Sequence, residues 1–179
     1  MTNKNIARST HNPSKIIGSK LDDILEGTDM SEQINGRQGS DKIKGNGGRD
    51  MINGAGGDDI IEGGAGDDSL FGGKGDDILF GGKGADILKG SFGADIFVID
   101  FRPEALLDGH DIILDFKLGE DKIFFHSHED ADFGDIKENG NDLEFYVDLG
   151  GDEVLASVML NVAKDDFYAS DSLTFVEIV

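Results

Sequence analysis

The sequence predicts an all-β protein, a solenoid of stacked parallel strands that is followed by a β-rich C-terminal cap. Three observations support this prediction. Glycine recurs every nine residues from Gly18 to Gly90 without an insertion. Each of these units carries Asp or Glu at its sixth position and one large apolar residue at its eighth. Chance does not plausibly produce such a period in unbroken phase.

Each position of the repeat has a physical reason. Glycines at the first position, and at the fourth position from Gly39 to Gly93, allow positive φ and a tight turn. The next three residues are predicted to form a short strand with a buried apolar centre. One unit cannot bury that residue alone, so two units form a coil of 18 residues. Stacked coils then form two facing apolar columns, one with Leu25, Ile43, Ile61, Leu79 and Phe97 and one with Ile34, Ile52, Leu70 and Leu88.

Stacking also aligns the sixth-position acids in two rows, one on each edge of the solenoid. Like charges about 5 Å apart repel by about 1 kcal/mol in water and by ~3–4 kcal/mol at an effective dielectric of 20. A cation between adjacent turns is therefore expected, and carboxylates with turn carbonyls suit Ca²⁺ better than Mg²⁺. The alternative is a glycine-rich roll that needs no metal, which would leave the aligned carboxylates without a partner.

The repeats 63–71 and 72–80 resemble the RTX, or hemolysin-type, calcium-binding nonapeptide. The resemblance implies a right-handed parallel β-roll that holds Ca²⁺ between turns two repeats apart. It implies carboxylate ligands at Asp23, Asp41, Asp50, Asp59, Asp68, Asp77, Asp86 and Asp95. It also implies backbone carbonyl ligands at Gly39, Gly48, Gly57, Gly64, Gly66, Gly73, Gly75, Gly82 and Gly84.

About five sites are expected to be well formed, with a few more at the ends of the roll. The five pair Asp41 with Asp59, Asp59 with Asp77, Asp77 with Asp95, Asp50 with Asp68, and Asp68 with Asp86. A sixth pairs Asp23 with Asp41 but has Leu21 in the glycine position. A seventh pairs Glu32 with Asp50, has Met30 in that position, and is expected to be weak or empty. Degenerate terminal repeats often cap stacked architectures.

Three regions are expected: a polar leader or cap over 1–17, the nine-repeat roll over 18–98, and a capping region over 99–179. The last region is predicted to contain strands at 111–116, 122–125, 143–149, 153–161 and 173–179. Turns are expected at Asn139-Gly140 and Gly150-Gly151, and a short helical turn at 165–170. The region is also predicted to cover an apolar outer patch of the roll formed by Ile60, Ile78, Phe80, Ile96 and Val98.

The motifs at 93–98, 111–116 and 119–123 resemble the cap that follows the roll in serralysin-type proteases and related type I secreted enzymes. In that family an acid from the cap can complete the last calcium site, and Asp111 is the candidate, with a solvated surface Asp as the alternative. The final residues, 174–179, resemble the C-terminal signal of type I secretion and equally suit a last strand of the cap.

Composition and missing motifs narrow the function. The net charge of -21 disfavours nucleic acid and anionic membranes, and the absence of cysteine excludes a disulfide scaffold and a thiol nucleophile. The sequence lacks His-Glu-x-x-His and Gly-x-Ser-x-Gly, the active-site motifs of the related proteases and lipases. His126 and His128 suit either a transition-metal site on one strand face or a polar loop.

We therefore predict a secreted, non-catalytic calcium-binding RTX module that folds on Ca²⁺ binding after export by the type I secretion machinery. The alternative is a Ca²⁺-dependent glycan- or protein-binding module of a larger secreted protein. An acidic polysaccharide is disfavoured because the lysines look scattered, with Lys74 and Lys83 on opposite edges. A third possibility, an enzyme with its chemistry in residues 99–179, has no acid constellation to support it.

Overall fold

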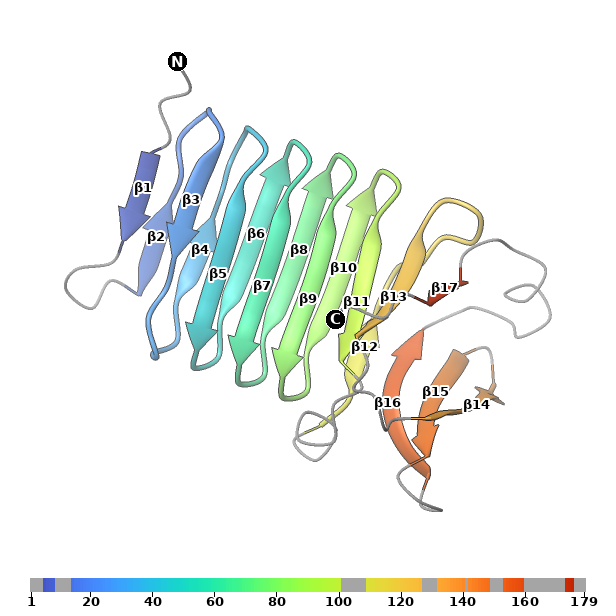
Figure 1. Cartoon of the computed structure of the whole chain (residues 1–179). Coiled ribbons are helices and arrows are strands. Elements are labelled where there is room, and N and C mark those ends of the chain that lie inside the picture. Colours follow the sequence, from blue (N-terminus) through green and yellow to red (C-terminus); the bar gives the residue numbers. More distant parts are fainter. Residues whose placement is uncertain are drawn as a thin grey trace.

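The computed structural model describes residues 5–8, 14–100, 109–126, 132–140, 142–148, 153–159 and 173–175. These residues form a stack of short strands connected by tight turns, as Figure 1 shows. Helices are absent from this part of the chain. Accordingly, none of the described residues lies in a helix long and apolar enough to cross a membrane.

The strands alternate between two sheets along the chain. One sheet has the order β1 (Asn5–Arg8), β3 (Asp23–Glu26), β5 (Lys42–Gly47), β7 (Ile60–Ala65), β9 (Ile78–Lys83), β11 (Ile96–Asp100), β13 (Lys122–His126), β17 (Leu173–Phe175). The other sheet begins with β2 (Lys15–Ile17), β4 (Gln33–Asn35), β6 (Met51–Gly56), β8 (Ser69–Lys74), β10 (Ile87–Phe92) and β12 (Asp111–Ile113). It continues with β16 (Glu153–Met159), β15 (Asp142–Asp148) and β14 (Asp132–Asn139).

Within the repeat region each strand pairs in parallel with the strand one coil away. The register is 18 residues, so that Ile43 lies beside Ile61 and Ile61 beside Leu79. This arrangement confirms the predicted parallel β-roll. Beyond the repeats, β12 and β13 extend the two sheets in parallel, and β14, β15 and β16 form an antiparallel meander at the end of one sheet.

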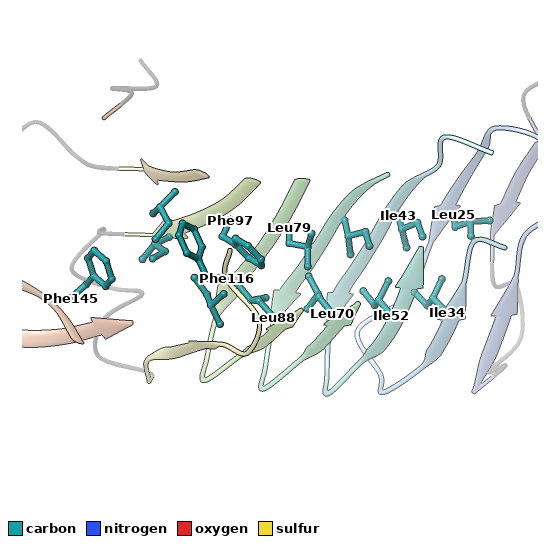
Figure 2. Close-up of a cluster of buried hydrophobic side chains, with 14 of the residues drawn as sticks. Leu25, Ile34, Ile43, Ile52, Leu70, Leu79, Leu88, Phe97, Phe116 and Phe145 are labelled. Atoms are coloured by element: carbon teal, nitrogen blue, oxygen red, sulfur yellow. The ribbon is translucent and has the colours of Figure 1, made fainter. Parts of the chain in front are cut away.

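The core consists of the two predicted apolar columns, which face each other between the sheets (Figure 2). The eighth-position side chains from Leu25 to Phe97 are at most 2% exposed. Each such side chain contributes about 1.5–3 kcal/mol through burial. Ile16 extends the core before the first repeat, and Ile113, Phe116 and Ile123 extend it after the last one. The roll thus has one continuous core along its axis.

The strands differ in length from the sequence prediction. The central ones have six residues because the first positions of the following repeat also pair, as Asn46 does with Gly64. The pairing of β1 with β3 and of β2 with β4 starts the sheets before Gly18. β14 was not predicted, whereas the turn at Asn139-Gly140 lies where it was expected. The turn at Gly150-Gly151, the helical turn at 165–170 and most of the final segment lie outside the described residues.

The predicted cover over the outer patch is wrong for Ile60, whose side chain is 43% exposed. The other four members, Ile78, Phe80, Ile96 and Val98, are partly buried. Ile60 stays exposed because the described C-terminal strands continue the two sheets along the axis of the roll (Figure 1). The apolar surface that they need is supplied by the open end of the core.

Candidate metal centre

The sixth-position acids form two buried ladders, one along each edge of the roll. In each ladder the Oδ1 atom of one Asp accepts a hydrogen bond from the backbone N–H of the acid one coil earlier. The N–H of Asp41 donates to Asp59 at 2.8 Å, and the N–H of Asp59 donates to Asp77 at 2.8 Å. The same bond links Asp77 to Asp95, Asp50 to Asp68, and Asp68 to Asp86. All five predicted acid pairs therefore lie in register.

The second carboxylate oxygen of each inner acid has no partner. The Oδ2 atoms of Asp41, Asp50, Asp59, Asp68, Asp77, Asp86 and Asp95 are buried and accept no hydrogen bond. A buried charged oxygen without a partner is strongly unfavourable, because it has lost its hydration without compensation. The ladders therefore call for a positively charged group beside each Oδ2 atom.

Carbonyl oxygens of the next coil lie near four of these Oδ2 atoms, those of Asp41, Asp50, Asp59 and Asp68. A Cβ atom placed on Gly63 would meet Asp68 Oδ2 at 2.5 Å and the carbonyl oxygen of Gly81 at 2.6 Å. Gly54 has the same surroundings, with Asp59 Oδ2 and the Gly72 carbonyl oxygen. A Cβ atom at the first position would thus clash with oxygen atoms from two successive coils, so that only glycine fits there.

The turns expose further carbonyls because their glycines adopt positive φ. At the fourth position φ is 106° for Gly39, 98° for Gly48, 118° for Gly57, 121° for Gly66, 119° for Gly75 and 122° for Gly84. At the second position it is 117° for Gly64, 122° for Gly73 and 111° for Gly82. A Cβ atom on Gly66 would overlap the carbonyl oxygen of Gly48, which lies one coil earlier. The Gly48 carbonyl therefore points toward the fourth-position turn of the next coil.

The sequence prediction missed one feature of the second position. Its backbone is left-handed even where the residue is not glycine, as in Arg37, Asn46, Ala55 and Ser91, with φ between 79° and 82°. Such conformations cost a non-glycine residue about 1–2 kcal/mol. Stacking against the neighbouring coils therefore imposes the turn shape, and the glycine pattern alone does not reveal it.

The donor chemistry fits Ca²⁺. Among the described residues no three His, Asp or Glu side chains gather around one point, so a metal ion here needs backbone carbonyls as ligands. The ladders offer a carboxylate and several carbonyls per turn, which are hard oxygen donors in a flexible arrangement. This set suits Ca²⁺, which takes six to eight oxygens, better than Mg²⁺ or Zn²⁺.

Burial makes these carboxyls reluctant to ionise. Desolvation raises the pKa of Asp59, Asp68 and Asp77 to about 7, although the backbone hydrogen bond from the previous coil acts in the opposite direction. The same cause raises the pKa of Asp41, Asp50 and Asp95 to about 6. For Asp86 desolvation and the charge of Asp111 raise the pKa to about 8. Neighbouring acids of the ladder add to each shift.

The N-terminal rungs differ from the inner ones. Asp23 accepts a hydrogen bond from Ser19 N–H at 2.5 Å through Oδ2, and its Oδ1 atom is buried and unpaired. Glu32 has both oxygens occupied, one by Thr28 N–H at 3.0 Å and the other by the Thr28 hydroxyl. Both carboxylate oxygens of Glu32 therefore accept hydrogen bonds from Thr28, which belongs to the same turn.

At the C-terminal end both ladders gain one more rung. Asp111 accepts the N–H of Asp86 at 3.1 Å, and Asp121 accepts the N–H of Asp95 at 2.9 Å. The structure thus brings Asp111 to the ladder, and its role as a calcium ligand stays a prediction. Asp121 was missed, although Asp121-Lys122-Ile123 repeats the spacing of an acid two residues before a buried apolar residue.

Asp115 closes the end of one edge in another way. Its two carboxylate oxygens accept the N–H groups of Gly90 at 3.0 Å and Ser91 at 2.9 Å. These are the donors of the last glycine turn, which has no further repeat above it. The alternative site at His126 and His128 lies outside the described side chains, so its geometry stays a prediction.

Stacked parallel coils with a buried acid and a glycine turn in each repeat define a calcium-binding β-roll. Residues 26–61 and 62–97 each match the family model of the RTX calcium-binding nonapeptide repeat, which covers four copies. The repeat region of this chain is therefore built from RTX calcium-binding nonapeptide repeats. No curated protein sequence matches the chain.

Several solved structures are similar to the chain at low identity. The extracellular lipase LipA from Serratia marcescens is 19% identical, with a TM-score of 0.42 over 94% of this chain and 41% of the lipase. This chain thus spans less than half the length of that lipase. The AlgE6R2 subunit of the Azotobacter vinelandii mannuronan C5-epimerase is 23% identical, with a TM-score of 0.45 over 92% of this chain and 94% of the subunit. The AlgE6R3 subunit of the same enzyme is 26% identical, with a TM-score of 0.24 over 90% and 87%.

Proposed function

We propose that this protein is an extracellular, non-catalytic calcium-binding module whose roll folds when Ca²⁺ binds between its turns. The observation that carries the proposal is the set of buried, unpartnered Oδ2 atoms along the two ladders. Four of them, on Asp41, Asp50, Asp59 and Asp68, lie close to a carbonyl oxygen of the next coil, and a bound Ca²⁺ would supply the positive charge that these oxygens lack.

The proposed ligands follow the sequence prediction. Five inner sites use the acid pairs from Asp41 to Asp95, with the carbonyls of the second- and fourth-position glycines. Asp111 and Asp121 extend the two ladders at the C-terminal end because they take the same hydrogen-bonding position. The site at Glu32 is proposed to remain empty, since both of its oxygens already accept hydrogen bonds. The division into leader, roll and capping region at residues 17 and 98 stays a prediction.

Metal binding and folding are coupled in this proposal. Without cations, the aligned charges repel and the glycines favour an open chain, because glycine loses the most backbone entropy on folding. About five Ca²⁺ ions would change the formal net charge from -21 to about -11. Low calcium inside the cell would keep the chain unfolded for a type I exporter, and millimolar calcium outside would fold it.

Circular dichroism with and without a calcium chelator tests the proposal. In excess chelator the far-UV β signal should be lost, and added Ca²⁺ should restore it cooperatively, whereas equimolar Mg²⁺ should not. A chain that keeps its full β signal in excess chelator would contradict the coupling of folding to Ca²⁺.

The second candidate function is a Ca²⁺-dependent binding module for a glycan or a protein. One observation favours it: the outer face of β6, β8 and β10 carries an open groove lined with aromatic and basic side chains. Such a rigid surface would form only after the roll has folded.

A further inference from the structure

A groove of about 350 Å³ lies on the outer face of the roll, across β6, β8 and β10. We name it the Phe71–Phe92 groove, and it is lined by Asn53, Ala55, Phe71, Gly73, Lys74, Lys89, Ser91 and Phe92. Its hollow shape follows from the repeat. Second-position residues with little or no side chain, such as Ala55 and Gly73, form the floor, and larger side chains stand on both sides.

The groove combines a highly exposed phenylalanine with two lysines that form no ion pair among the described residues. Phe92 is 69% exposed, the largest value among the large apolar side chains described. Its strand partner is Lys74, and the partner of Lys89 is Phe71, so each phenylalanine has a lysine beside it on the adjacent strand. Elsewhere in the roll, Lys44 and Arg49 form ion pairs with Glu62 and Asp67. Lys74 and Lys89 form no such pair among the described residues.

This placement corrects one step of the sequence analysis. The lysines looked scattered along the chain, but Lys74 and Lys89 converge because their strands are neighbours in the sheet. This face of the molecule therefore presents two lysines that one acidic polysaccharide can contact.

We propose that the Phe71–Phe92 groove binds an acidic glycan, and this inference rests on the proposed Ca²⁺-dependent folding. A sugar ring presents an apolar face of C–H groups that can pack on Phe71 and Phe92. Carboxylate or sulfate groups would pair with Lys74 and Lys89, and hydroxyl groups with Asn53 and Ser91.

An extended peptide suits this surface less well. The backbone N–H and C=O groups of β8 are used in pairing with β6 and β10, so a peptide cannot add a strand here. The nearby turn acids Asp58 and Asp76 each accept a backbone N–H from the next coil, at 2.9 Å. The proposed Ca²⁺ sites on Asp59, Asp77 and Asp95 lie in the same turns, and their positive charge would offset these acids.

The test is a binding titration of the Ca²⁺-loaded chain with a hyaluronan hexasaccharide and a chondroitin sulfate hexasaccharide. Maltohexaose and hexaglutamate serve as the neutral glycan and the acidic peptide. At least one acidic hexasaccharide should bind, more weakly at high salt. The Lys74→Gln/Lys89→Gln double variant and the Phe92→Ala variant should each bind about tenfold more weakly or worse. Lys83→Gln, an exposed lysine outside the groove, should bind normally.

Circular dichroism of every variant with Ca²⁺ separates this inference from the proposed function. A chain that folds with Ca²⁺ but binds neither acidic hexasaccharide overturns the groove proposal alone. Equal binding of maltohexaose, tighter binding of hexaglutamate, or full binding by the folded groove variants would also overturn it. Failure to fold with Ca²⁺ would overturn the proposed function first.

Discussion

The inner rungs and the N-terminal rung of the same ladder handle a buried carboxylate in different ways. Glu32 is 3% exposed and satisfies both of its oxygens with Thr28. Asp68 is 1% exposed and leaves Oδ2 without a partner. Thr28 supplies both donors from the glutamate's own turn, whereas Asp68 accepts only the N–H of Asp50 from the coil before. The comparison teaches that an inner aspartate, in a turn whose second and fourth positions adopt positive φ, keeps one oxygen without a partner.

The largest effect is expected when an inner rung is neutralised. Asp77 belongs to two proposed sites, so Asp77→Asn should remove up to two bound ions and raise the Ca²⁺ concentration needed for folding by about tenfold or more. The asparagine oxygen can still accept the N–H of Asp59, so the change removes mainly the charge. Native mass spectrometry would count the ions, and circular dichroism would follow folding.

Glu32→Gln is the matched variant for this experiment. It removes one acid from the same type of position, but its site is proposed to be empty, so ion count and folding midpoint should stay unchanged. If both variants lost ions equally, the distinction between inner and terminal rungs would be wrong.

The second effect concerns the turns that present the carbonyls. Gly66→Ala should destabilise the Ca²⁺-loaded roll by more than about 1–2 kcal/mol, since φ is 121° and the new Cβ would overlap the Gly48 carbonyl oxygen. Ala55→Gly relieves a left-handed alanine but adds backbone entropy, so its net effect should stay within about 1 kcal/mol. Thermal unfolding in Ca²⁺ measures both, and a similar loss for the two would argue against the imposed turn shape.

The third effect is a pH dependence that changes sign with Ca²⁺. Burial raises the pKa of Asp59 and Asp77 from 3.8 to about 7, so the metal-free folded state binds more protons than the unfolded chain between these values. Without Ca²⁺ the chain is expected to be unfolded at neutral pH, so its β signal in chelator should rise as the pH falls from about 8 to about 5. With Ca²⁺ it should lose stability over the same range, because protonated carboxyls are poor ligands.

Circular dichroism across this pH range, in chelator and in Ca²⁺, checks the two slopes. If folding responded to pH in the same direction in chelator and in Ca²⁺, the ladder carboxyls would not control the pH dependence under both conditions.

The smallest effect is expected on the outside of the roll. Lys44 and Glu62 link neighbouring coils by an ion pair of 2.8 Å, but their side chains are 48% and 39% exposed. Lys44→Gln should therefore change the free energy of unfolding by less than about 1 kcal/mol. The free energy of unfolding would be measured by denaturant titration with Ca²⁺. A larger loss would show that surface ion pairs, and not the ladders, hold neighbouring coils together.

The roll was predictable because its period is a property of the sequence. A residue at the eighth position, such as Ile61, must be buried wherever two coils stack, and the acid two residues before it must then join a ladder. The parallel register of 18 residues and the pairing of the inner acids follow from the same period. The stacking of the repeats and the charge of their acids are both visible in the sequence, and together they indicate Ca²⁺.

The C-terminal rungs of the ladders and the outer groove depend on contacts that the nine-residue period does not encode. Asp111 and Asp121 reach the ladders from 25 and 26 residues away, because the connecting segments are longer than a repeat. Their separation from the last repeats differs from the 18-residue period, although each acid stands two residues before a buried apolar residue, as in the repeats. The Phe71–Phe92 groove was equally hidden, since its side chains come from successive coils and meet only through strand pairing.

A crystal structure grown with Ca²⁺, with anomalous difference density to locate the ions, tests the central claim most directly. Peaks are predicted next to the Oδ2 atoms of the inner rungs, from Asp41 to Asp95, with no peak beside Glu32. Inner turns without density at saturating Ca²⁺, or an ion bound to Glu32 alone, would contradict the account.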